Sequence, residues 1–142
     1  MATYSSDAFT KNAPIPQLGH AGELKSVTWT VACTAAPSTS DTLNFGYVPA
    51  NASLKLAVLE ATDMDTNGSP ALTLNVGDSG SASRLFAAST VGQAGTVSTS
   101  IAAAGAGYKF TDKTLITGTA AVNAATGAAG TVYLTLFYTI EP

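Results

Sequence analysis

The segment 63–68, Asp-Met-Asp-Thr-Asn-Gly, has the residue types and spacing of the first half of a calcium-binding loop. In such loops alternate oxygen ligands surround the cation, and a glycine at the sixth position lets the chain turn. The second half does not match, because the twelfth position is Leu74 instead of a bidentate glutamate. We therefore expect no bound metal. The only candidate ligands are Asp63, Asp65 and Asn67.

The alternative for this segment is a hairpin turn between two strands. In such a turn the Asp and Asn side chains accept hydrogen bonds from nearby backbone N–H groups, and Gly68 adopts positive φ.

His20 and Cys33 are the only histidine and cysteine, so they limit what nucleophilic or zinc chemistry the chain can do. His20 lies beside Gly19 in a segment without a regular pattern, where no partner would orient it as a base. Cys33 shares a strand face with Trp29 and Val31, so we expect a buried and unreactive thiol. One histidine and one cysteine cannot form the usual zinc sites. With no carboxylate pair placed across a cleft, we expect no catalytic residues, no cofactor and no enzymatic activity.

Composition narrows the class of protein further. Of the 142 residues, 11% are charged and 46% are hydrophobic, which predicts a folded chain with one core. The net charge of -3 has the wrong sign for a nucleic-acid partner. No apolar run is long enough to cross a membrane, and no signal peptide is recognisable, so we expect synthesis in a cytoplasm.

Strands are predicted wherever apolar residues alternate with polar ones. The clearest case is 27–33, where Val27, Trp29, Val31 and Cys33 share one face. In 54–59, Leu54, Leu56 and Val58 are expected on one face, opposite Lys55, Ala57 and Leu59. The last segment, 132–140, is apolar on both faces and is expected to be buried on both. Further strands are predicted at 43–47, 72–76, 115–122, 96–101 and 107–110.

These segments predict an all-β fold, a jelly-roll-like antiparallel β-sandwich of about eight strands over residues 23–142. Residues 84–91 fit either a helical turn or a strand. Residues 1–22 contain prolines and glycines without hydrophobic periodicity, so we expect an extended N-terminal arm.

Several strand-and-turn segments together resemble the capsid decoration, or cement, proteins of tailed bacteriophages. The longest of them runs from Phe45 to Asp78. The further segments are 86–90 (Phe-Ala-Ala-Ser-Thr), 93–95 (Gln-Ala-Gly), Tyr108 followed by Asp112, and the closing 130–138. The resemblance covers most of the chain after the arm.

The resemblance implies a structural virion protein made in the host cytoplasm. Such a protein binds the outer surface of the capsid, often as a homotrimer, and stabilises contacts between major capsid protein subunits. It has no catalytic residues and needs neither nucleic acid nor a membrane. Capsid contacts are expected from the arm, at Phe9, Pro14, Ile15, Pro16, Leu18 and His20.

The alternative function is a carbohydrate- or receptor-binding β-sandwich of a phage tail or an adhesin. It would need an exposed row of aromatic side chains, drawn from Trp29, Tyr47, Tyr108, Tyr133 and Tyr138. Core packing is the stronger expectation for Trp29, because its neighbours at two-residue spacing are apolar.

Overall fold

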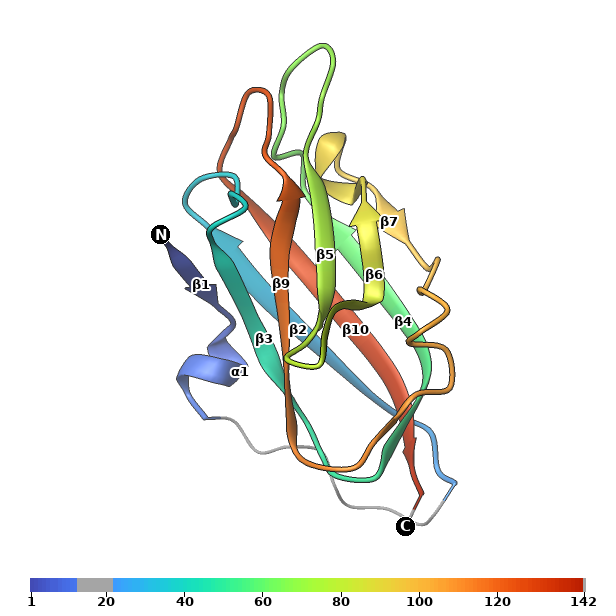
Figure 1. The fold of residues 1–142 in the computed structure, drawn as a ribbon. Helices are drawn as coiled ribbons and strands as arrows, with labels where there is room; N and C mark the ends of the chain where they lie inside the picture. The colour runs from blue at the N-terminus through green and yellow to red at the C-terminus, as the bar shows by residue number, and fades with distance from the viewer. Residues whose placement is uncertain (13–21, 142) are drawn as a thin grey trace.

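Two β-sheets pack face to face in the computed structural model, which describes residues 1–12 and 22–141 (Figure 1). The front sheet in Figure 1 has the order β1-β3-β9-β5-β6, and its strands are β1 (Thr3–Ser5), β3 (Thr42–Val48), β9 (Thr114–Val122), β5 (Thr73–Asp78) and β6 (Ser81–Ser89). The back sheet has the order β2-β10-β4-β7, with β8 also paired to β4, and its strands are β2 (Lys25–Cys33), β10 (Gly130–Ile140), β4 (Ala52–Ala61), β7 (Val97–Ser98) and β8 (Lys109–Phe110). The short helices are α1 (Asp7–Thr10) and the 3-10 helix η1 (Val91–Gln93).

Every strand pair is antiparallel except β1 with β3, which is parallel. The predicted all-β, jelly-roll-like sandwich is therefore confirmed, with ten strands among the described residues where about eight were expected. Residues 84–89, which fitted either a helix or a strand, belong to β6, and η1 follows them.

The core lies between the sheets, and β2 shows how the sequence produces it. Trp29, Val31 and Cys33 are buried, while Thr30 and Ala32 between them are exposed. The predicted alternation in this strand is confirmed. Strand β10 alternates in the same way, because its outward residues are only half-buried. The prediction that β10 is buried on both faces is wrong, since its outward residues Tyr133, Thr135 and Phe137 remain partly exposed.

Strand β4 departs from the predicted alternation because it contains a β-bulge. Leu54 pairs with Tyr138 and Leu56 pairs with Phe137, so Lys55 is an extra residue in β4. A bulge reverses the face that later residues occupy. Ala57 and Leu59 are consequently buried, whereas Leu56 is 40% exposed, and the prediction that Leu56 and Val58 share the face of Leu54 is wrong.

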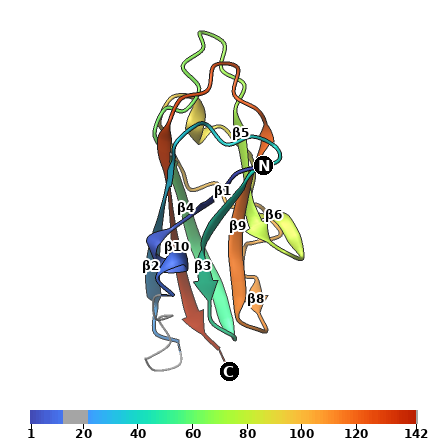
Figure 2. The same ribbon diagram turned by 90° about the vertical axis from the view of Figure 1, so that its left-hand side faces the viewer.

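The N-terminal segment packs across the side of the sandwich where β2 and β3 lie (Figure 2). The Ser6 side chain caps α1 by accepting a hydrogen bond from the Phe9 N–H at 3.1 Å, and its hydroxyl donates to the carbonyl of Phe45. Residues 3–10 are thus folded against the sandwich instead of extending from it. The rest of the expected arm, residues 13–21, lies outside the described residues.

Candidate interaction surfaces

The loop between β4 and β5 is organised by one buried carboxylate, Asp65. Both of its oxygens accept backbone hydrogen bonds of 2.7 to 3.0 Å, from the N–H groups of Ala71, Leu72, Ala125 and Thr126. Burial opposes ionisation of Asp65, but these four N–H groups lower the pKa of its carboxyl well below the ordinary value. Asp65 therefore joins its own loop to the loop between β9 and β10.

The other two candidate metal ligands also hydrogen-bond locally. Asp63 accepts from the N–H of Asp65 at 3.1 Å, and Asn67 accepts from the N–H of Ser69 at 2.9 Å. Within residues 1–12 and 22–141, no group of three His, Cys, Asp or Glu side chains is arranged to hold a metal. The contacts match the alternative of a turn stabilised by its own side chains. Two details of that alternative are wrong, because the loop connects the two sheets and φ of Gly68 is not positive.

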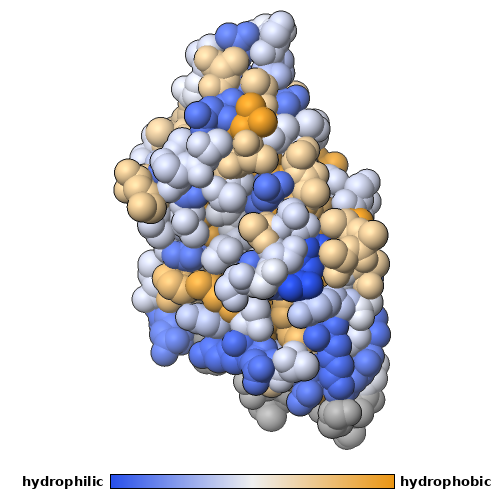
Figure 3. Space-filling model, in the orientation of Figure 1, coloured by the Kyte–Doolittle hydropathy of each residue, from blue (hydrophilic) through white to orange (hydrophobic). Residues whose placement is uncertain are grey.

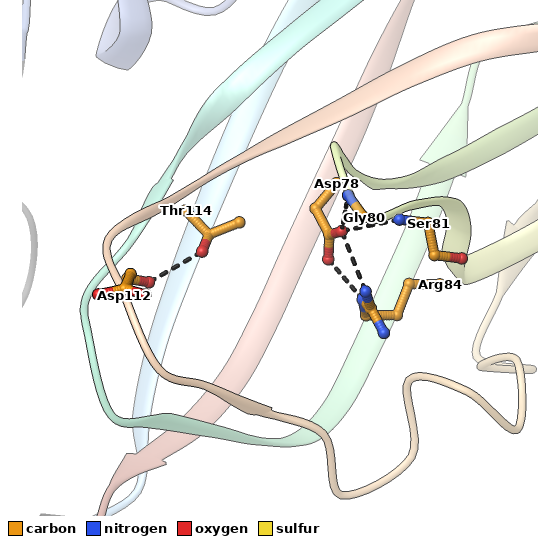
Figure 4. Close-up of polar contacts among 6 residues, drawn as sticks. All are labelled: Asp78, Gly80, Ser81, Arg84, Asp112 and Thr114. Carbon is orange, nitrogen blue, oxygen red and sulfur yellow. Dashed lines mark hydrogen bonds and ion pairs between the residues drawn. The ribbon is translucent and has the colours of Figure 1, made fainter.

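At the opposite end of the sandwich, Asp78 and Arg84 form a two-pronged ion pair (Figure 4). The Arg84 Nε lies 2.5 Å from Oδ2 of Asp78, and Nη2 lies 3.2 Å from Oδ1. Asp78 also accepts hydrogen bonds from the N–H groups of Gly80 and Ser81 in the β5–β6 turn. The guanidinium lies 3.8 Å from the ring centroid of Tyr108, so Arg84 also connects the loop before β8 to this ion pair.

This cluster does not have the properties of a hydrolase acid. Burial opposes ionisation of Asp78, but Arg84 and the N–H groups of the turn lower the pKa of its carboxyl. A general acid needs a raised pKa instead. The neighbouring Asp112 accepts a hydrogen bond at its backbone carbonyl from the Thr114 hydroxyl at 2.8 Å. The arrangement stabilises two turns and shows no acid–base pair.

Cys33 is buried, as expected. Burial, with a smaller contribution from the nearby Asp41 carboxylate, raises the pKa of the Cys33 thiol to about 11. At neutral pH the group is therefore a thiol, which is a poor nucleophile. The other candidate, His20, lies outside the described residues.

Of the six expected capsid-contact residues, the structure describes only Phe9. Its ring stacks on Tyr47 with centroids 6.1 Å apart, and Lys113 Nζ lies 4.4 Å from the Tyr47 centroid. Phe9 is therefore partly used in holding α1 to β3. The remaining five, Pro14, Ile15, Pro16, Leu18 and His20, lie outside the described residues.

The outward surface of the back sheet carries an apolar patch that the sequence analysis missed. We call it the outer apolar face, and it consists of Leu56, Val58, Val97, Tyr133 and Phe137. Phe137 lies opposite Leu56, and Tyr133 lies opposite Glu60, which in turn pairs with Val97. The bulge at Lys55 is what turns Leu56 and Val58 outward. Leu56 and Val58 lie two and four residues after Leu54, so alternation alone assigns both to the buried face, and the sequence held no signal for this patch.

The outward surface of the front sheet has a different character. Hydroxyl and amide side chains face each other at two of its cross-strand positions, with Asn44 opposite Thr117 and Asn75 opposite Thr119, while Tyr47 lies opposite Leu115 under Phe9. Figure 3 shows this face as mostly hydrophilic or neutral, with only small and scattered hydrophobic areas. The two outer faces of the sandwich are therefore chemically unequal.

An exposed aromatic row of the kind that binds sugars would need several of the five candidate rings. Trp29 and Tyr138 are 4% and 1% exposed, so neither is available. Tyr108 packs against Arg84 and Phe110. Tyr47 is partly covered by Phe9, which leaves Tyr133 as the one ring of these five on the outward surface of the back sheet.

No helix among the described residues is long and apolar enough to cross a bilayer. No protein-family model matches the chain, and neither does any curated protein.

Solved structures do match. The chain is 40% identical to a chain of the cyanophage Pam1 capsid asymmetric unit, with a TM-score of 0.78, and the match covers 90% of this chain and 92% of that one. It is 32% identical to a chain in the capsid of Ralstonia phage GP4, with a TM-score of 0.87 and 99% of both chains covered. Sequence and fold thus agree over nearly the whole length of two chains from phage capsids. This protein belongs to a family of bacteriophage capsid-associated structural proteins, and its place is in the virion.

Proposed function

We propose that this protein is a decoration, or cement, protein without enzymatic activity. It is made in the host cytoplasm, binds the outer surface of a tailed-phage capsid as an oligomer, and stabilises contacts between major capsid protein subunits. The observation that carries the proposal is the near full-length similarity to chains from two phage capsids. The chemistry of the described residues supports it, because the ionisable groups at both ends of the sandwich stabilise turns. Neither nucleic acid nor a membrane has a role in this proposal.

Copies of the protein associate through the outer apolar face. Packing this face against a second copy removes Leu56, Val58 and Phe137 from water, which favours association. Glu60 and Tyr133 are suited to the same contact, because a carboxylate and a phenol can hydrogen-bond between copies. A homotrimer, as the resemblance implies, would close this association into a symmetric ring.

Oligomerisation matters because it multiplies weak contacts with the shell. Once one protomer has bound, the others are held at high effective concentration near their own sites. In our proposal residues 1–22 supply one such contact, with residues 3–10 held to the sandwich. Each oligomer then adds bonds across the joints between capsid subunits.

The self-contact is tested by the substitution L56K, which places a charge within the outer apolar face. We expect L56K to weaken self-association roughly tenfold or more, since the ammonium must be desolvated in the contact. The matched control is T117K on the front sheet, which should leave association unchanged. Light scattering over a concentration series gives the number of copies. A wild-type chain that remains monomeric at high concentration contradicts this part of the proposal.

The capsid contact is tested by co-sedimentation with purified heads that lack the protein. The wild-type chain should bind to saturation. A variant with Gly and Ser at positions 14–20 should bind more weakly while keeping the thermal stability of the wild type. We prefer this variant to a deletion of residues 1–22, because β1 and α1 pack on β2 and β3. Equal binding by both proteins would exclude a role for the arm.

A further inference from the structure

One asparagine of this chain stands in a different chemical setting from the rest. The sequence has six asparagines, and only Asn67 is followed by glycine; the others, Asn12, Asn44, Asn51, Asn75 and Asn123, are followed by Ala, Phe, Ala, Val and Ala. Asparagine is thermally labile because its side-chain amide can be attacked by the next backbone nitrogen. A following glycine favours this attack, since it has no side chain to hinder the nitrogen and its backbone rotates freely.

The structure leaves this reaction unobstructed. Asn67 and Gly68 are both exposed, and they belong to the loop between β4 and β5, which forms the top of the molecule in Figure 1. A Cβ placed on Gly68 would have no atom within 4 Å. The Gly68 N–H donates no hydrogen bond to another described residue, so the nitrogen that must attack is free.

The Asn67 side-chain amide makes two hydrogen bonds, one of which favours the attack. Its Oδ1 accepts a hydrogen bond from the Ser69 N–H at 2.9 Å, and its Nδ2 donates to Oγ1 of Thr126 at 2.9 Å. The Ser69 N–H polarises the carbonyl and stabilises the negative charge that develops on Oδ1 during attack.

We propose that Asn67 is a site of spontaneous deamidation. The Gly68 nitrogen loses its proton to solvent and forms a bond to Cγ of Asn67. The Cγ–Nδ2 bond then breaks, and ammonia leaves with a proton from solvent. Water opens the resulting five-membered imide at one of its two carbonyl carbons. The product is aspartate or isoaspartate at position 67, and no oxidant or reductant is needed.

The modification changes the loop in two ways. It replaces the Nδ2 donor to Thr126 with a carboxylate, and it adds a negative charge near Asp63 and Asp65. In the isoaspartate product the backbone also gains one carbon, which displaces the Ser69 N–H. The charge at this end of the sandwich therefore increases with the age of the particle, because a protein within a virion is not replaced.

The test is peptide mass spectrometry on the full-length protein incubated at mildly alkaline pH and 37 °C. We expect aspartate and isoaspartate to accumulate at position 67 at least tenfold faster than at any of the other five asparagines. The variant G68A should fold normally, given the open space around Gly68, and should slow the reaction at least tenfold. Modification no faster than at the other asparagines would overturn the proposal, and so would an equal rate in G68A. Neither result bears on capsid binding, which the co-sedimentation experiment tests independently.

Discussion

Asp65 and Asp78 are carboxylates with different partners and the same task. Asp65 is 1% exposed and is satisfied entirely by backbone N–H groups from two loops. Asp78 is 6% exposed and combines backbone donors with the Arg84 guanidinium. Both ends of the sandwich are thus fixed by one ionised acid each. A charged acceptor is worth more than a neutral one in this role, since hydrogen bonds to ions are shorter and stronger.

We expect the substitution D65N to lower the melting temperature by roughly 5–10 °C, because an amide leaves some of the four N–H groups without an acceptor. The effect should depend on pH. The pKa of Asp65 is lower in the folded state, so the carboxylate stabilises the fold above the unfolded value of about 3.9, and this stabilisation is lost in acid. Thermal unfolding of both proteins between pH 7 and pH 3 should show the difference shrinking in acid. A constant difference would contradict the assignment.

We expect R84K to lower the free energy of unfolding by about 1–2 kcal/mol, since lysine cannot make the paired hydrogen bonds to Asp78 or stack on Tyr108 in the same way. Urea denaturation measures the change. The exposed K11R is a suitable control, because the Asp7–Lys11 pair lies on the surface. Equal stability of R84K and the wild type would show that the ion pair contributes nothing.

At the scale of elements, the Trp29 side chain of β2 packs directly against the backbone of β3 at Gly46. A Cβ on Gly46 would overlap the indole nitrogen of Trp29, which is buried between the sheets. The substitution G46A should therefore cost about 1–3 kcal/mol through overpacking. The control is G68A, where the added methyl group meets nothing. Equal stability of the two variants in urea denaturation would contradict the close packing of Trp29 against Gly46.

The strands also show how much of the fold could be predicted from the sequence alone. Alternation predicted β2 and its buried face correctly, because a regular strand keeps a period of two along its whole length. The same rule failed in β4, where one extra residue at Lys55 reversed the faces of Leu56 and Val58. Strand β1 was missed because it has only three residues, although Ser6 before Asp7 is a recognisable helix-capping signal. The position of Tyr133 opposite Glu60 could not be predicted, because it depends on the register between two strands that are far apart in the sequence.

For the whole molecule, the important feature is the inequality of the two outer faces. A sandwich that acted alone would have no need of apolar side chains on the outside of the back sheet, since they add nothing to its core. The polar front sheet shows that this fold can carry hydroxyl and amide side chains there instead. In our proposal the outer apolar face is the contact between copies, which assemble on the virion.

The most direct test of the central proposal is electron microscopy of purified phage heads, with and without this protein added. The proposal predicts ordered density of this fold on the outer surface of the shell, across joints between major capsid protein subunits, and heads that withstand higher temperature once coated. Density inside the shell, or heads that remain bare at saturating protein, would contradict it.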